Sequence, residues 1–294
     1  MAELVDLLAA VEDCSPHESG AFLVDGDGDG AVLGSVFVET GRVCWASSPG
    51  RSGRLRDLLL RNSARPVNDV ELDDAFAACR KAQRPLGELL VERGLVSDDG
   101  LRAALKQHTV ESLIAQCDGQ PRAVTWVPHR HRGYHARFTF TPVELLAAAG
   151  AQLYPNWSLG AEPEWIFELP GASTLGSFAI GDEDQPVAVW AAGAGAARVR
   201  DLLGLGDWAA AALAVCNGFS PAAMDRALAG VTGSAALGWR SSRRLVHAAV
   251  IDDPAILVQV VGELAERGLS PVLSSRVPIT HLEDSRTRST RQEI

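Results

Sequence analysis

The apolar positions in the first part of the chain change from helical to strand spacing. Residues 3–12 place apolar side chains at helical intervals, which predicts a short amphipathic helix. Three apolar runs of strand length follow, and the Thr40-Gly41 dipeptide between two of them predicts a tight turn. We therefore expect a β-meander with strands at residues 20–24, 31–39 and 42–47.

Helical spacing dominates the next part of the chain. Helices are expected at residues 51–62 and 69–81, followed by a helical hairpin over residues 84–116. Within the hairpin, Gly94 stands where a helix end needs a left-handed residue, and Ser97 suits the N-cap of the next helix. The hairpin is either pure scaffold or a docking surface for another protein's helix, and both interpretations stay open.

Two further strands and a helix complete the first half. The strands are expected at residues 123–127 and at 136–141, where the sequence ARFTFT alternates cleanly. Pro142 suits the first position of a helix that runs to about Leu153. Residues 155–163 are rich in proline, glycine and polar residues, so we interpret them as a linker.

The second half repeats the mixture of strands and helices. The pattern predicts strands at 173–180 and 186–192, helices at 196–205 and 208–216, a helix starting at Ser220-Pro221, strands at 234–240 and 245–251, and a helix at 254–267. The polar C-terminal stretch is expected to be disordered.

Composition narrows the class of protein. A chain of 294 residues is too long for one ordinary core, so two domains are expected. The formal net charge of −10 opposes binding to nucleic acid phosphates. Five scattered cysteines indicate free thiols in a reducing compartment. No long apolar run and no signal-like N-terminus occur, so we expect a cytoplasmic protein without a membrane span.

The order of motifs in the first half resembles a known family. Gly34, residues 41–46 (GRVCWA) and the later Phe138-Thr139-Phe140 before a helix resemble the PATAN-type domain of bacterial signalling proteins. The segment PLGELLVERGLVSDDGLRAAL inside it is similar to the N-terminal helical domain of type II secretion ATPases. Together these resemblances cover about residues 1–155, and both imply action through protein contacts.

Three features occur in order along the second half: residues 169–172 (LPGA), the turn at residues 182–186, and the late strand pair before a terminal helix. In this order they resemble a roadblock-type domain, related to dynein light chains and longin-like folds. It departs from the family at residues 205–231, where three helical pieces stand in place of one longer helix. The resemblance covers about residues 165–270 and implies dimerisation through a shared sheet and helix, with regulation of Ras-like GTPases in bacteria.

We therefore predict an α+β protein of two domains. Residues 1–154 form a PATAN-like β-meander domain with a helical insert at 69–117, and residues 164–272 form a roadblock-like or longin-like α/β sandwich. Residues 273–294 form the polar tail.

Three patterns carry alternative chemistry. Asp25, Asp27, Asp29 and Gly30 imitate the start of a calcium loop, but position 12 is Val36 and strands should flank the loop, so a hairpin turn is the main interpretation. His129, His131 and His135 offer either part of a zinc site or a basic loop that faces an acidic partner or another part of the chain. Residues 193–198 (GAGAAR) are either a strand-to-helix turn or the anion-binding turn of a nucleotide site.

No catalytic constellation occurs in the sequence. Cys216 lacks a nearby basic residue and is expected to be a buried apolar cysteine.

We expect no catalytic residue, no cofactor and no metal, and a function in signalling or scaffolding by protein–protein interaction. The expected partner is a small Ras-like GTPase or a polarity, motility or secretion assembly, and the chain is expected to form a homodimer. The expected partner-binding residues are Glu88, Glu92, Arg93, Arg102, Lys106, Arg240, Arg243 and Arg244. The last three lie at a hairpin tip that is either a contact patch or simply solvated.

Overall fold

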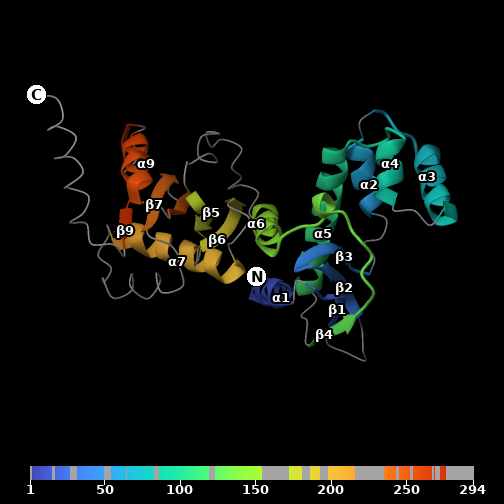
Figure 1. Ribbon diagram of the computed structural model, residues 1–294, viewed down its shortest axis with the longest axis horizontal. Coiled ribbons are helices and arrows are strands. Elements are labelled where there is room, and N and C mark those ends of the chain that lie inside the picture. Colours follow the sequence, from blue (N-terminus) through green and yellow to red (C-terminus); the bar gives the residue numbers. More distant parts are fainter. Residues whose placement is uncertain are drawn as a thin grey trace, which may run out of the picture. The chain divides into compact units, whose positions relative to one another are not determined.

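The chain is described here by a computed structural model. It describes residues 2–14, 17–26, 32–49, 54–63, 65–82, 86–118, 123–153, 172–180, 186–192, 198–215, 235–242, 245–251, 254–266, 268 and 272–275. The chain divides into two compact units, Met1–Ala149 (unit 1) and Gly150–Ile294 (unit 2). Each unit contains helices and an antiparallel sheet, which confirms the predicted α+β class (Figure 1).

Unit 1 is built on a four-stranded antiparallel sheet of order β3-β2-β1-β4. Its strands are β1 (Ser19–Asp25), β2 (Val32–Glu39), β3 (Arg42–Ser47) and β4 (Ala123–Pro128). The first three strands form the expected meander. Thr40 and Gly41 join β2 to β3 with φ angles of 54° and 70°. Two successive left-handed residues suit a tight hairpin turn whose twist matches that of the flanking strands.

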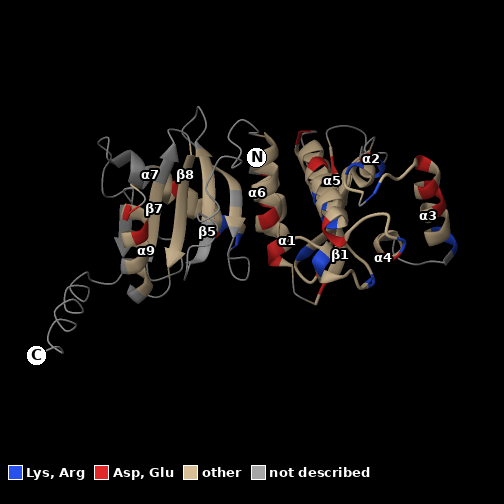
Figure 2. Cartoon of the chain, turned by 90° about the horizontal axis from the view of Figure 1, so that it is seen from above, with Lys and Arg blue, Asp and Glu red and all other residues tan. Residues whose placement is uncertain are grey.

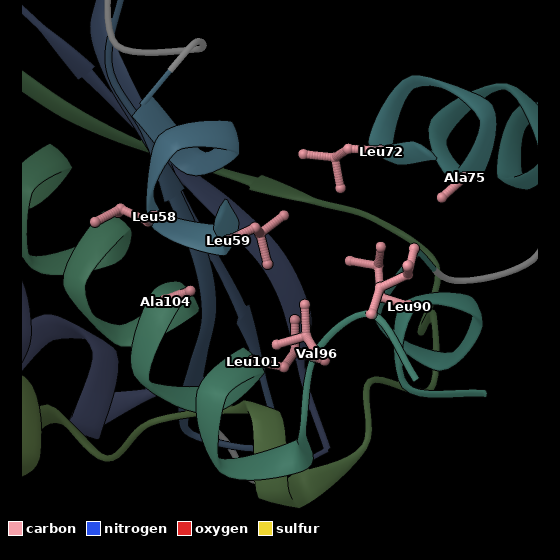
Figure 3. Close-up of a cluster of buried hydrophobic side chains, with 9 residues drawn as sticks. Leu58, Leu59, Leu72, Ala75, Leu90, Val96, Leu101 and Ala104 are labelled. Atoms are coloured by element: carbon pink, nitrogen blue, oxygen red, sulfur yellow. The ribbon is translucent and has the colours of Figure 1, made fainter. Parts of the chain in front are cut away.

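Four helices of unit 1 share one apolar core. The helices of the unit are α1 (Ala2–Asp13), α2 (Arg54–Arg61), α3 (Asp69–Ala82), α4 (Leu86–Glu92) and α5 (Asp98–Asp118), and α6 (Pro142–Leu153) begins in unit 1 and extends past its last residue, Ala149. Figure 3 shows the core formed by α2 to α5, in which the labelled side chains are Leu58, Leu59, Leu72, Ala75, Leu90, Val96, Leu101 and Ala104. Because α2 contributes two buried leucines, the helical segment begins upstream of residue 69, where the insert was expected to start.

The junction between α4 and α5 follows the capping chemistry that the sequence predicts. Gly94 adopts a φ of 63°. The backbone N–H of Leu95 donates to the carbonyl of Leu90 at 3.0 Å, and that of Gly94 donates to Val91 at 2.9 Å, which is the hydrogen-bond pattern of a Schellman motif. Ser97 then caps α5, because its hydroxyl accepts from the N–H of Gly100 at 3.0 Å.

The second half of α5 packs on β2 and β3 through polar residues. The ring of His108 stacks on Trp45 with centroids 4.3 Å apart. The side-chain amide of Gln116 donates to the carbonyl oxygen of Ser47 at 2.8 Å. Gly34 makes this close approach possible, since a Cβ there would lie 2.2 Å from the same carbonyl and 2.4 Å from Nε2 of Gln116.

The predicted strand at residues 136–141 is wrong. Ala136–Phe138 form a 3₁₀ helix, η1, in which Nδ1 of His135 accepts from the N–H of Arg137. Only Phe140 pairs like a strand residue, through reciprocal 2.9 Å hydrogen bonds with Val43. A strand would pair with its neighbour at several successive residues, and this segment pairs only at Phe140. The alternation of ARFTFT therefore marks a 3₁₀ turn followed by one buried residue, Phe140.

Unit 2 holds a five-stranded antiparallel sheet of order β6-β5-β8-β7-β9. Its strands are β5 (Ala172–Ile180), β6 (Pro186–Ala192), β7 (Ala235–Ser242), β8 (Leu245–Ile251) and β9 (Val272–Ser275). All but β9 were expected, and β9 overlaps the start of the predicted tail. The described side chains of β8 are all buried. Helix α9 (Pro254–Glu266) packs on β8, and Gly268 follows it with a φ of 76°.

Residues 199–215 form one helix, α7 (Val199–Val215), where two helices were predicted. Gly206 lies between the two predicted helices, but it serves packing inside one continuous helix. A Cβ on Gly206 would lie 2.6 Å from the ring of Phe178, which is fully buried. Gly176 on β5 approaches the same ring equally closely. The predicted linker, the helix from Ser220 and the tail beyond Ser275 lie outside the described residues. Among the described helices, none is both long and apolar enough to cross a membrane.

Candidate interaction surface

Strand β4 is exposed on both of its faces. It lies at an edge of the unit 1 sheet, and nearly all of its residues are exposed. Val124 keeps 46% and Val127 keeps 41% of its surface in solvent. Because successive strand residues point to opposite faces, these two valines project to opposite sides of the sheet. An edge strand with exposed apolar side chains is a surface to which another chain can add.

Trp126 gives this edge strand a fixed aromatic centre. Its indole lies over Gly20 on β1, where a Cβ would stand 2.4 Å from ring atom Cζ2. Its ring centroid is 4.7 Å from that of Phe22, the residue opposite it on β1. The glycine thus makes room for an indole that is held against the sheet while remaining half-buried.

A cationic segment continues directly from β4. We call residues 129–137 the basic loop; its residues are exposed along nearly their whole length. No Asp or Glu occurs within residues 119–143. Arg137 forms an ion pair with Asp98 at the start of α5. In the described part of the chain, no carboxylate forms an ion pair with Arg130 or Arg132, and the guanidinium of Arg132 lies 5.7 Å from the ring centroid of Phe37.

A buried carboxylate holds the basic loop in place. Glu39, at the end of β2, is only 3% exposed. Its two carboxylate oxygens accept from the backbone N–H groups of Arg132 at 2.5 Å and of Tyr134 at 3.2 Å. Nε2 of His131 lies 3.4 Å from the same carboxylate. Because a buried carboxylate needs hydrogen-bond donors, this loop satisfies Glu39, and Glu39 in turn fixes the path of the loop.

The three histidines of the basic loop have separate roles. His129 contacts the carbonyl of Arg130 at 2.8 Å, His131 faces Glu39, and His135 caps η1. Within the described ranges, no group of three or more His, Cys, Asp or Glu side chains is arranged to hold a metal ion. The geometry therefore assigns these side chains to the loop's own structure.

The predicted partner-binding residues of the helical hairpin fall into two groups. Glu88, Glu92 and Arg93 are exposed, as expected. Arg102 instead faces α6, where it donates to both carboxylate oxygens of Glu144 at 2.7 and 2.8 Å. Its guanidinium also donates to the carbonyls of Arg137 and Thr139 and lies 4.8 Å from the ring centroid of Phe140.

Lys106 joins the same network, because its Nζ lies 3.5 Å from Glu144. Arg102 and Lys106 thus fasten α5 to the segment that leads into α6. Arg42 on β3 holds the same segment from the sheet. Its guanidinium donates to the hydroxyl of Thr139 at 2.6 Å and to the carbonyl of Thr139 at 2.8 Å. We assign Arg102 and Lys106 to internal fastening rather than to the docking face on which they were expected.

Several sequence candidates cannot be placed. Arg243 and Arg244, Cys216, residues 27–30 of the acidic turn and residues 193–197 of the glycine-rich turn lie outside the described residues, as does the side chain of Arg240 on β7. The β1 and β2 strands on either side of the acidic turn pair as a hairpin, as expected. Among the described residues, Cys14, Cys44, Cys79 and Cys117 form no disulfide.

The described part of unit 2 contains a serine–histidine pair that is sealed from solvent. The hydroxyl of Ser177 lies 2.8 Å from Nδ1 of His247, and both residues are 0% exposed. The ring of Trp239 stacks on His247 with centroids 5.4 Å apart. Burial lowers the pKa of His247 to about 4. A substrate cannot reach this pair, so it serves the packing of β5, β7 and β8.

Negative charge is concentrated on α3, one of the four helices of the apolar core. Figure 2 shows acidic residues, in red, along α3, which carries Asp69, Glu71, Asp73 and Asp74. Arg56 on α2 bridges two of them, at 2.9 Å from Asp69 and 2.6 Å from Asp73. These are exposed ion pairs, which contribute little to stability.

Sequence reasoning missed the two carboxylates that organise unit 1, Glu39 and Glu144. Glu39 had a visible signal, since it is an acidic residue within an apolar strand and precedes a tight turn. Glu144 stands in the first turn of α6, where acidic residues are common at any helix start, so nothing marked it.

A scan of protein-family models and searches of curated proteins and of solved structures found no match to this chain.

Proposed function

We propose that this chain is a non-catalytic cytoplasmic protein that acts through protein–protein interaction. The observation that carries the proposal is the exposed edge of β4 running into the basic loop. A chain with a net charge of −10 concentrates cations there and leaves apolar side chains in solvent beside them. Such a surface suits contact with another protein, because exposed apolar area and complementary charge together favour specific association.

The finer assignment follows the two family resemblances. Unit 1 would be a PATAN-like domain, supported by its meander, its helical segment and the late return of the chain to the sheet at β4 and Phe140. Unit 2 would be a roadblock-like domain, supported by its antiparallel sheet and the strand pair before α9. The implied partner is a small Ras-like GTPase or a component of a polarity, motility or secretion assembly, and the implied assembly is a homodimer.

Binding to purified Ras-like GTPases from the same genome tests the proposal directly. The full chain is immobilised, and each GTPase is applied with GDP or with a non-hydrolysable GTP analogue. We expect binding that depends on the nucleotide state. Charge reversal of the exposed Glu88, Glu92 and Arg93 tests whether the helical hairpin takes part, with Arg56→Glu on α2 as the matched control. Light scattering of the free chain tests the homodimer.

A thermal-shift series with ATP, GTP and NAD tests the alternative, a nucleotide-binding protein or enzyme that uses residues 193–198. The proposed function predicts no change of melting temperature with any of them. A clear rise with one nucleotide, together with no binding of any GTPase, would replace the interaction hypothesis with the nucleotide hypothesis.

A further inference from the structure

We propose that β4 binds an extended acidic segment of a partner protein as a fifth strand of the unit 1 sheet. This inference rests on the proposed function and names the chemistry of the partner at that surface. The segment would hydrogen-bond to the open edge of β4 and place its carboxylates against the basic loop.

The register of the sheet shows which backbone groups of β4 are available. The N–H of His129 donates to the carbonyl of Ser19, so the pair Ser19–His129 is a hydrogen-bonded pair of the antiparallel ladder. Hydrogen-bonded pairs alternate along such a ladder, so Thr125 and Val127 also direct their backbone groups toward β1. Val124 and Trp126 therefore direct their N–H and C=O groups outward, where no described strand pairs with them.

Pro128 limits how far an added strand can continue. It occupies the next outward-facing position, and proline has no N–H to donate. Backbone pairing would therefore end at Pro128, at the point where the basic loop begins. An added segment would therefore form backbone hydrogen bonds with Val124 and Trp126. Beside the basic loop it would interact through charged side chains and not through further backbone pairing.

The side chains of β4 offer apolar contact on both faces of an added strand. Val124 and Trp126 lie on one face and Val127 on the other, and both valines are more than 40% exposed. A strand with small or β-branched residues would cover all three. The indole of Trp126 is already held against Gly20 and Phe22, so its position does not have to be fixed on binding.

Charge favours an acidic occupant. Arg130 and Arg132 are exposed and form no ion pair with any described carboxylate, and residues 119–143 contain no acidic residue. Glu39 fixes the loop through two backbone N–H groups, so the cationic side chains start from a defined position. Carboxylates placed opposite them would gain attraction that a neutral or basic segment lacks.

A second copy of this chain fits the edge less well. Antiparallel pairing of β4 with itself would bring the basic loop of each copy beside the residues that precede β4 of the other. The four residues that precede β4, residues 119–122, include Arg122 and no acidic residue, so next to β4 the loop would meet a cation and no carboxylate. In the antiparallel arrangement, an acidic partner segment would carry its carboxylates at its N-terminal end, next to the basic loop.

Synthetic peptides provide the probe. The test peptide begins with a short run of acidic residues followed by alternating valine and threonine, with both ends capped. Three controls replace the acidic residues by lysine, move them to the C-terminal end, or place proline within the valine–threonine part. Binding to the full chain is measured by titration calorimetry at several salt concentrations, and residue-level hydrogen exchange is followed by NMR.

We expect only the test peptide to bind well, with an affinity that falls as salt rises. On binding, exchange of the Val124 and Trp126 amides should slow by about tenfold or more, whereas the Thr125 and Val127 amides, already bonded to β1, should change little. Val124→Pro removes one outward donor without touching the β1 ladder and should weaken binding about fivefold to tenfold. Val124→Thr keeps the donor and is its control.

Charge reversal tests the basic loop separately. Arg130→Glu should weaken binding about fivefold, while Arg61→Glu at the exposed end of α2 should leave it unchanged. Far-UV circular dichroism of each variant checks that the fold is retained. Equal affinity for the lysine peptide, unchanged exchange at Val124 and Trp126, or unchanged binding by Val124→Pro each overturn the inference.

Two other occupants are also distinguished. Self-association of the chain that Val124→Pro abolishes would assign the edge to a second copy, and binding of a single-stranded oligonucleotide that Arg130→Glu abolishes would assign it to nucleic acid; either result overturns the acidic-segment inference. Failure here is separable from failure of the proposed function. If a GTPase binds wild type and both variants equally, the proposed function stands and this inference fails.

Discussion

Two glycines on α7, two residues apart, should respond differently to the same substitution. In Gly204→Ala, the added Cβ meets no atom within 4 Å, so the variant gains only helix propensity, about 1 kcal/mol. In Gly206→Ala, the Cβ would lie 2.6 Å from Cδ1 and 2.7 Å from Cε1 of Phe178. The ring has no simple retreat, because it also lies against Gly176 and is 0% exposed.

The difference between the two variants isolates the packing cost. Both gain the same propensity, so that contribution cancels, and the difference equals the cost of overpacking at Phe178, about 1–3 kcal/mol. Gly204→Ala should therefore raise the free energy of unfolding of unit 2, and Gly206→Ala should lower it or leave it near the wild-type value. Phe178→Leu should recover part of the loss in Gly206→Ala, because the smaller side chain vacates the space that the Cβ enters.

Equilibrium urea unfolding measures these changes. Tryptophan fluorescence reports the transition, and hydrogen exchange of peptides from α7 assigns it to unit 2. A comparison at constant m-value ensures that the midpoint reflects stability. If both alanine variants shift the midpoint by the same amount in the same direction, the close approach of α7 to Phe178 does not exist in solution and the assignment of Gly206 to packing is wrong.

Three further predictions concern side chains that the fold buries or fastens. Burial lowers the pKa of His247 to about 4, against about 6.5 when unfolded, so unit 2 should keep full stability above about pH 6.5 and lose about 2 kcal/mol by about pH 5. His247→Gln should flatten that pH dependence in urea titrations, and an unchanged slope would refute the assignment. Arg102→Ala removes the bidentate contact with Glu144 and should cost about 1–3 kcal/mol by urea unfolding of unit 1. Arg56→Ala, at an exposed pair, is its control, and equal midpoints would contradict the fastening role. Burial, together with the charge of Glu39, raises the pKa of Cys44 to about 12, so iodoacetamide at about pH 8 should modify the more exposed Cys14 about tenfold faster by mass spectrometry. Equal rates would show that Cys44 is accessible.

Local capping and periodicity predicted much of unit 1, because those signals act over a few residues. Gly94 and Ser97 illustrate this: a left-handed residue after an apolar helix and an N-cap before the next one leave few alternatives. The alternation at residues 136–141 misled for the same reason. Its pattern is local, whereas the 3₁₀ turn depends on Val43, Arg42 and Arg102, which lie far away in the sequence.

The glycines of α7 show the limit of local signals more sharply. The sequence pattern predicted a break between residues 205 and 208, where Gly206 lies, yet the neighbouring Phe178 determines why Gly206 is needed. The interaction surface was foreseen only in part. The charge of the basic loop was evident in the sequence, but the edge position of β4 depends on pairing with β1, which no local pattern reveals.

The place of β4 in the sheet sets an order of assembly. β1 lies between β2 and β4, and its second neighbour is synthesised only after α2 to α5. During synthesis the meander is therefore complete while the edge of β1 that bonds to β4, with the backbone groups of Ala21 and Leu23, still lacks its partner strand. Long-range strand pairing of this kind forms slowly and leaves an aggregation-prone edge until it closes. Until residue 128 has left the ribosome, β4 cannot cover the open edge of β1. In that interval a nascent chain of this protein would depend most on a chaperone to prevent aggregation through this edge.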